Sequence, residues 1–229
     1  MLGSGTYDLK GKVDKDKLIL GESIYNLKSK GDMEKLLLGD FNAPVEFFIN
    51  PYRGNEGPSS LRIVKDSLNT WSLEVKYISN FKEVNRELSD KYLSIGYSFP
   101  VPSDEDIEQM REHNVAAWAK RKEESLNLYK ADILLFPISN HFAEQLYEKM
   151  VSLIVNFKVK EFLDRISTGG YSVSFRAVID YEVWSLWISN PPDENERKMV
   201  DLCKQIITDA QANQLDESKY ITILETFEN

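Results

Sequence analysis

A strand pair that occurs twice constrains the fold of this chain more than any other feature. The residues Arg62–Asp66, a short turn and Trp71–Leu73 recur as Arg176–Asp180, a turn and Trp184–Leu186. In both copies apolar and polar residues alternate with a period of two, which is typical of β-strands that place one face against a core. Each copy therefore predicts an antiparallel hairpin whose second strand anchors a tryptophan in the core.

The two hairpins are also the basis for predicting a longer repeat. A helical stretch follows each hairpin, and then a similar pentad, Lys91–Ile95 in the first half and Lys219–Ile223 in the second. Each half then has the order helix, strand, strand, helix, strand, which predicts half-repeats at 22–100 and 139–226 related by a pseudo-twofold. The alternative is that hairpins of similar composition look alike without a duplication.

The remaining segments favour one α+β domain over residues 21–229, built as a mainly antiparallel sheet of about six strands packed with amphipathic helices. The apolar run Val45–Ile49 lies between two prolines, which is typical of a strand at a sheet edge. Ser103 and Asp106 form a capping pair at the start of a long polar helix. Residues 1–20 are polar and predict a flexible N-terminal arm.

Composition excludes some classes of partner and leaves the compartment open. The chain carries a net charge of −9, so it repels phosphate backbones and nucleic acid is not an expected partner. Cys203 is the one cysteine, which excludes an internal disulfide, and its apolar helical neighbours predict a small buried side chain. No apolar stretch is long enough for a transmembrane helix. The cytoplasm fits, as does the periplasm or secretion if a signal peptide has been removed.

The residues that usually carry catalysis or bind metals are sparse. His113 and His141 are the only histidines, and they lie far apart in sequence from each other and from the cysteine. That spacing does not match a transition-metal site, and no Gly-x-Ser-x-Gly motif is present. We therefore expect no metal and no cofactor.

Two arginine–aspartate pairs are the candidate ligand or partner site. Asp66 follows Arg62 by four residues, and Asp180 follows Arg176 by four, so each pair lies on one strand face. On adjacent strands these four residues would form a polar patch that serves either as cross-strand charge pairing or as recognition of a small ligand or partner. Trp187 lies on the strand face opposite Trp184, where it either contacts a partner or is covered by a helix.

Several segments of the chain resemble a known group of sequences. Leu36–Phe48, the hairpin near Trp71 and the segment Asp201–Ala210 resemble an uncharacterised family of bacterial conserved hypothetical proteins. The resemblance covers most of the chain and implies a bacterial origin. It implies no activity, because that family carries no assigned function.

These observations lead to three functional hypotheses. The first is a non-enzymatic binding or interaction protein, because no catalytic constellation is evident in the sequence. The second is a carboxylate-dependent hydrolase that uses Asp66, Asp180 or the acidic cluster Asp104–Glu108. The third is an immunity- or chaperone-like protein whose acidic charge suits a basic partner. The sequence leaves the oligomeric state open.

Overall fold

The computed structural model describes most of the chain, and the statements below refer to that part. The described residues are 12–17, 31–39, 43–51, 56–66, 68, 70–96, 103–157, 170–180, 182–191 and 194–227.

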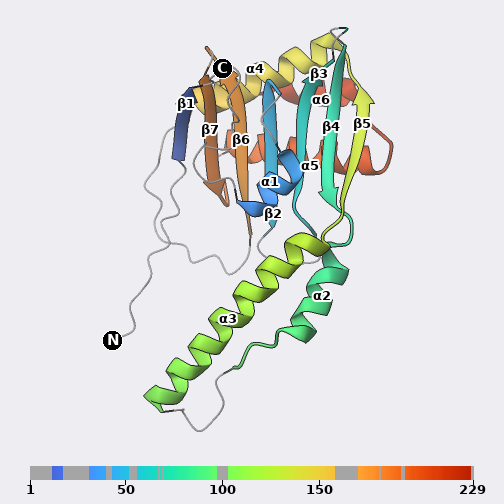
Figure 1. Cartoon of the computed structure of the whole chain (residues 1–229). Helices are drawn as coiled ribbons and strands as arrows, with labels where there is room; N and C mark the ends of the chain where they lie inside the picture. Colours follow the sequence, from blue (N-terminus) through green and yellow to red (C-terminus); the bar gives the residue numbers. More distant parts are fainter. Residues whose placement is uncertain are drawn as a thin grey trace.

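Seven strands form one sheet in the order β1-β7-β6-β2-β3-β4-β5 (Figure 1). Every pair of neighbours is antiparallel. The strands are β1 (Lys12–Lys17), β2 (Val45–Pro51), β3 (Ser59–Lys65), β4 (Trp71–Ile78), β5 (Ala131–Pro137), β6 (Tyr171–Ile179) and β7 (Glu182–Ser189). The predicted α+β fold with an antiparallel sheet is confirmed. Within the predicted flexible arm 1–20, residues 12–17 instead form the edge strand β1, and the rest of that arm lies outside the described residues.

Six helices accompany the sheet in the described part of the chain. They are α1 (Asp32–Leu38), α2 (Phe81–Lys91), α3 (Asp104–Leu128), α4 (Asn140–Asn156), α5 (Glu194–Gln211) and α6 (Glu217–Glu225). The helices α4, α5 and α6 cover one face of the sheet, and α1 lies against the other face (Figure 1). The pair α2 and α3 extends beyond one end of the sheet.

The main core lies between the sheet and α4, α5 and α6. Alternation along the strands directs Phe47 of β2 and Phe175 of β6 into this core, where their ring centroids are 5.2 Å apart. On α4, Phe142 and Leu146 recur four residues apart and are fully buried, as the amphipathic pattern requires. Each such burial stabilises the fold by about 1.5–3 kcal/mol. The predicted anchors Trp71 and Trp184 are partly buried and pack against the same core, and Cys203 is fully buried as predicted.

The two pentads that were predicted as strands have other structures. Lys91 ends α2, and residues 92–96 continue without strand pairing. The second pentad, Lys219–Ile223, lies inside α6, whose N-cap Asp216 accepts a hydrogen bond from the Lys219 backbone N–H. The prediction failed because its β-branched residues favour a strand locally. A strand would bury Thr222 on the same face as Tyr220 and Leu224, but Thr222 is exposed, so only helical geometry buries these two residues and leaves Thr222 in solvent.

The similar hairpins are not related by a twofold axis, and the half-repeats 22–100 and 139–226 are not formed as predicted. Both β3 and β6 pair antiparallel with β2, so they run in the same direction on either side of it. Arg62 and Arg176 oppose the same residue of β2 and therefore share a face. The second strands lie on opposite sides, β4 to one side and β7 to the other. When the first strands and their arginines are aligned, the second strand therefore lies on opposite sides in the two hairpins. The hairpins are arranged as mirror images of each other, and no rotation superimposes them.

β2 lies in the middle of the sheet, which corrects its prediction as an edge strand. Pro51 is the last residue of β2, and Pro44 precedes the first, so neither removes a donor from the strand interior. The Pro44 carbonyl itself accepts a hydrogen bond from the Val178 N–H of β6, 3.0 Å away. Prolines at both ends thus mark the length of this strand and not its position in the sheet.

The helices α2 and α3 form an arm inserted between two neighbouring strands. Ile78 of β4 pairs with Ala131 of β5, and residues 79–130 leave and rejoin the sheet at this point. Asn80 is the N-cap residue of α2, but its side chain makes no capping hydrogen bond and closes the base of the arm. Its side chain donates to the Leu128 carbonyl at 2.9 Å and accepts from the Lys130 N–H at 2.8 Å. We call residues 79–130 the α2–α3 arm.

Candidate interaction surface

The two arginines predicted to form a polar patch do come together, through a carboxylate that the sequence reasoning missed. Glu46 of β2 lies directly opposite Arg62 of β3 and Arg176 of β6. Its carboxylate oxygens lie 3.8 Å from Arg62 Nη1 and 3.2 Å from Arg176 Nη1. All three side chains are buried. The signal in the sequence was a charged residue inside an otherwise apolar strand.

The cluster extends along the same sheet face to β4. Arg62 Nε donates to Glu74 Oε1 at 2.6 Å, and Lys76 Nζ lies 3.1 Å from the same oxygen. Burial raises the pKa of Glu74, but the hydrogen bonds from Arg62 and Lys76 outweigh it, so the pKa lies below its usual value. Arg62 Nη1 also donates to the Leu38 carbonyl at 3.1 Å, which holds the end of α1 against the sheet. Together with the contacts of Glu46, these contacts link four neighbouring strands, β6, β2, β3 and β4, and α1, which is a structural role.

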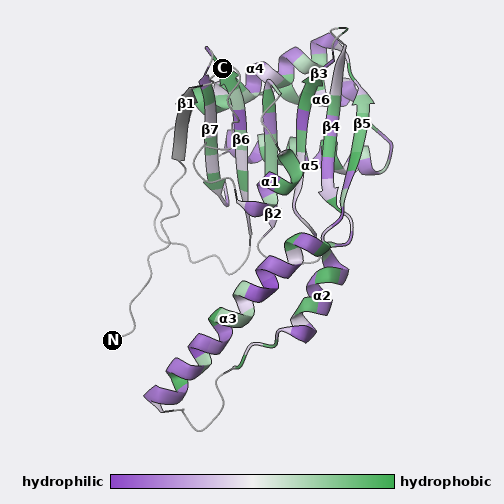
Figure 2. Ribbon diagram, viewed as in Figure 1, coloured by the Kyte–Doolittle hydropathy of each residue, from purple (hydrophilic) through white to green (hydrophobic). Residues whose placement is uncertain are grey.

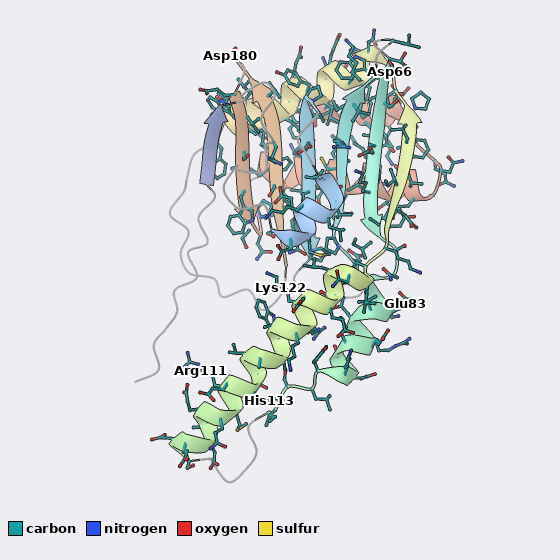
Figure 3. The ribbon with its side chains drawn as sticks, viewed as in Figure 1. Asp66, Glu83, Arg111, His113, Lys122 and Asp180 are labelled. Carbon is teal, nitrogen blue, oxygen red and sulfur yellow. The ribbon has the colours of Figure 1, made fainter. Side chains whose placement is uncertain are left out.

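The predicted aspartates do not join this cluster. Asp66 Oδ1 accepts from the backbone N–H groups of Leu68 and Thr70, both at 2.8 Å, so it organises its own hairpin turn. Asp180 occupies the turn between β6 and β7 with a positive φ of 50°. Both lie at the end of the sheet away from the arm (Figure 3). Because β2 separates β3 from β6, the two parent strands are about 10 Å apart.

Trp187 lies on the face opposite the core, as predicted, with Ser174 as its cross-strand neighbour. Its side chain is 40 % exposed. Trp187 is therefore not fully covered, but it is less exposed than Trp118 on the arm.

The α2–α3 arm is held together by polar clamps as much as by apolar packing. At the end of α2, Lys91 Nζ lies 2.6 Å from Glu124 Oε1, and the Tyr92 hydroxyl donates to Glu124 Oε2 at 2.6 Å. These hydrogen bonds, that from Lys91 first, lower the pKa of Glu124. Near the base, Lys122 Nζ lies 2.6 Å from Asp32 Oδ2 and ties α3 to α1. The hydrogen bond from Lys122 lowers the pKa of Asp32.

A second clamp fixes the segment that follows α2 along α3. The Asn114 side chain accepts from the Ile95 N–H at 2.8 Å and donates to the Ile95 carbonyl at 3.0 Å. The preceding residue of α3, His113, places its Nε2 3.2 Å from the Leu93 carbonyl. The backbone of residues 93–95 is therefore held beside α3 by side chains that reach out from the helix.

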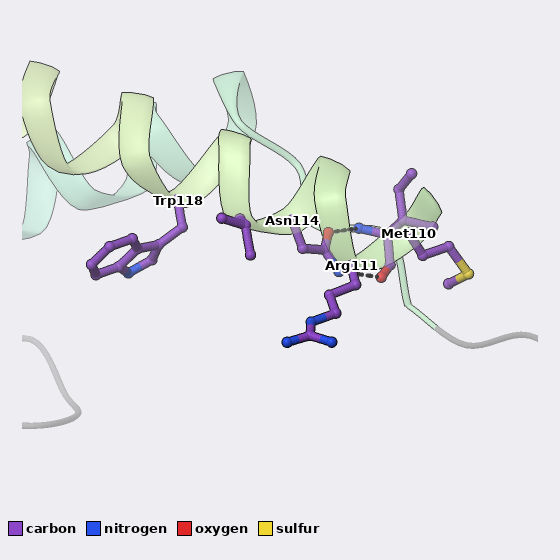
Figure 4. Close-up of a pocket in the computed structure, with 6 residues that line it drawn as sticks. Met110, Arg111, Asn114 and Trp118 are labelled. Atoms are coloured by element: carbon purple, nitrogen blue, oxygen red, sulfur yellow. Dashed lines mark hydrogen bonds between the residues drawn. The ribbon is translucent and has the colours of Figure 1, made fainter. Parts of the chain in front are cut away.

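This arrangement creates an open groove of about 470 Å³ on the arm (Figure 4). Its lining residues are Ile95, Met110, Arg111, Asn114, Val115 and Trp118. Trp118 is 64 % exposed and Val115 is 61 % exposed, and Leu93 and Ile95 nearby are exposed too. Large apolar side chains are thus exposed to solvent together on and beside α3, which is otherwise mainly hydrophilic (Figure 2).

The sequence offered one unused indication of this surface. Trp118 interrupts a long polar helix in which only Ala117 and Ser125 are buried. A tryptophan on such a helix has no core to enter, so its exposure follows from the low amphipathicity of α3. Trp187, and not Trp118, was predicted from the sequence as the contact residue.

The described part of the chain offers no group of three or more histidine, cysteine, aspartate or glutamate side chains placed to hold a metal ion. Burial raises the pKa of the Cys203 thiol well above its usual value, which disfavours the reactive thiolate. None of the described helices combines the length and apolarity that a membrane crossing requires.

Comparisons with known proteins give no match: no family model, curated protein or solved structure is similar to this chain. The resemblance to a bacterial hypothetical family stays a prediction.

Proposed function

We propose that this protein is a non-enzymatic interaction protein that binds a protein partner through the α2–α3 arm. The observation that carries the proposal is the exposure of Trp118 in the groove on an arm that extends beyond the sheet (Figures 1 and 4). A tryptophan left in water gains a large apolar contact area when a partner covers it.

The composition of the groove supports the same conclusion. Tryptophan, methionine and arginine are enriched at the centres of protein interfaces, and Trp118, Met110 and Arg111 line this groove together. Asparagine and aliphatic side chains complete the surface. Such a mixture suits a protein surface better than a small polar substrate.

The clamps around the groove favour binding by limiting its entropic cost. Asn114 fixes the backbone of Ile95, and Glu124 fixes the end of α2, before any partner arrives. Pre-organised surfaces lose less conformational freedom on association, so more of the contact energy contributes to affinity.

The alternative of a carboxylate-dependent hydrolase has less support. Retaining glycosidases place their carboxyl groups about 5–5.5 Å apart and inverting ones about 6.5–9.5 Å. Asp66 and Asp180 belong to strands separated by β2, and the Asp66 side chain is engaged in its own turn. The acidic cluster Asp104–Glu108 is largely exposed on the first turns of α3.

Affinity capture with matched variants tests the proposal. Wild type, Trp118→Ala and Leu68→Ala would be used as baits in an extract of the native host. Leu68 is 83 % exposed in the turn between β3 and β4, so it controls for loss of an exposed apolar side chain. We expect wild type and Leu68→Ala to recover the same protein, and Trp118→Ala to recover about thirtyfold less, as for an interface hot spot. Equal recovery by all three baits would contradict the proposal.

A further inference from the structure

One exposed stripe of α3 has a charge pattern that is complementary to itself. Residues spaced three and four apart place five side chains on one side of the helix, and we call them the outer stripe: Glu108, Arg111, Val115, Trp118 and Lys122. All five are exposed. Arg121, which reaches Asn85 of α2, and the buried Ala117 lie on a different side of the helix.

The order of the outer stripe distinguishes between the two ways of pairing it with a copy of itself. Glu108 precedes Val115 by seven residues and Lys122 follows it by seven. An antiparallel copy centred at Val115 therefore places Glu108 opposite the partner's Lys122. A parallel copy would instead place Glu108 against Glu108 and Lys122 against Lys122, which is repulsive.

The same antiparallel register suits the remaining residues of the stripe. Arg111 precedes the centre by four residues and Trp118 follows it by three, so each guanidinium approaches the other copy's indole, as in a cation–π contact. Val115 meets its own counterpart at the centre. Ala119, one turn after Val115, is exposed and small, so the two helices have room to approach at an interaxial distance of about 8–10 Å.

The length of the arm also permits this pairing. α3 has 25 residues and is about 37 Å long at a rise of about 1.5 Å per residue. Val115 lies close to its midpoint, so two antiparallel copies overlap along nearly the whole helix. Each sheet then lies at an opposite end of the pair.

We propose that a second copy of this chain docks antiparallel on the outer stripe and covers the groove at Trp118. The proposal rests on the arm being the binding element, as proposed above, and identifies its partner as the protein itself. A basic segment is a poorer occupant because it would meet Arg111 and Lys122. Lys122 also contacts Asp32 at 2.6 Å, yet about half of its side chain stays exposed for the partner.

Sedimentation equilibrium of charge-swapped variants tests the pairing. We expect wild type to form a dimer and Glu108→Lys and Lys122→Glu each to dissociate about tenfold more readily, because two symmetric pairs become repulsive. An equimolar mixture of the two single variants restores both pairs and should form a heterodimer with wild-type affinity. The double variant should also dimerise like wild type. Loss of the Asp32 contact in Lys122→Glu cannot produce this rescue, so rescue separates pairing from local damage.

Several outcomes would overturn the inference. The inference fails if wild type stays monomeric at every concentration, or if mixing the two single variants does not restore dimerisation. It also fails if Trp118→Ala dimerises as strongly as wild type. If the monomer nevertheless captures another protein, or binds a basic amphipathic peptide, in a manner that depends on Trp118, the arm remains the binding element and only its occupant is wrong. If capture is also independent of Trp118, the proposed function fails with the inference.

Discussion

At the scale of single residues, the structure depends on a buried carboxylate, Glu46, that lies between two buried arginines. Glu46 is fully buried between Arg62 and Arg176. Glu46→Gln keeps the shape but removes the negative charge, which leaves Arg176 buried beside a neutral amide. Removing one partner of a buried pair costs about 3–5 kcal/mol, and we expect urea unfolding to show a loss at the lower end because Arg62 keeps Glu74.

The control for Glu46 is an exposed pair of the same type. Glu194 and Lys198 are 2.8 Å apart at i and i+4 on the first turns of α5. We expect Lys198→Gln to change the free energy of unfolding by less than about 0.5 kcal/mol. A Glu46→Gln variant as stable as this control would show that the cluster contributes nothing to stability.

The lowered pKa of Glu74 predicts part of the acid sensitivity of the fold. Hydrogen bonds from Arg62 and Lys76 overcome the effect of burial and place this pKa below its unfolded value. Its stabilising contribution is therefore complete above the unfolded pKa of about 4.3 and is lost as the pH falls through the folded pKa. We expect Glu74→Gln to be less stable at pH 7 and to lose less further stability on acidification. This expectation would be contradicted if the urea midpoints of wild type and Glu74→Gln fell by the same amount between pH 7 and pH 3.

At this scale, the two arginines were predictable from the sequence, but their shared partner was not. Arg62 and Arg176 were selected because they recur in two similar hairpins, and both do contact one residue. Glu46 was missed because Pro44 and Pro51 suggested an edge strand, where a glutamate would face water. Asp66 and Asp180 were selected by spacing alone, and spacing carries no information on where the chain turns.

At the scale of elements, the segment after α2 depends on one side chain of α3. Asn114 bonds both the N–H and the carbonyl of Ile95, so it protects that amide from exchange. We expect Asn114→Ala to speed hydrogen exchange at Ile95 by about five- to tenfold or more, since one net hydrogen bond contributes about 1 kcal/mol. Asn127→Ala is the control, because its side chain bonds only the Glu123 carbonyl of its own helix. Unchanged exchange at Ile95 in Asn114→Ala would show that the clamp does not hold the segment.

Elements with a strong period were predictable, and short β-branched runs were not. Both hairpins, α4 and the capping box of α3 at Ser103 and Asp106 follow from local pattern and capping chemistry. Lys219–Ile223 has strand propensity, but contacts with the core decide in favour of the helix. The course of residues 92–96 depends on Asn114 and His113, which no local pattern in that segment reveals.

At the scale of the whole molecule, the proposed binding surface and the folded core are largely separate. Trp118 is not part of either buried core cluster, so the free energy of unfolding should not depend on it. We expect Trp118→Ala to unfold within about 0.5 kcal/mol of wild type while losing its binding. The core variant Leu146→Ala should instead lose about 2–5 kcal/mol. A Trp118→Ala protein as destabilised as Leu146→Ala would make Trp118 a structural residue.

The overall arrangement was only partly predictable, because the pairing of strands that are distant in sequence cannot be inferred from any single segment. The α+β class follows from the alternation of strand and helix patterns. The central place of β2 and the opposite lateral order of the two hairpins depend on which strands meet, and a local sequence match cannot decide that. The projection of the arm follows from residues 79–130 being inserted between β4 and β5, which become neighbours only in the fold.

Photocrosslinking from position 118 tests whether the α2–α3 arm is the binding element, because it reports contacts of the intact protein in its host. A photoreactive phenylalanine derivative at position 118 keeps an aromatic side chain in the groove, and the same residue at position 68 samples the exposed turn between β3 and β4. The account predicts a defined adduct from position 118, either with a second copy or with another protein, and none from position 68. No adduct from position 118, or the same adducts from both positions, would contradict the assignment of the α2–α3 arm as the binding element.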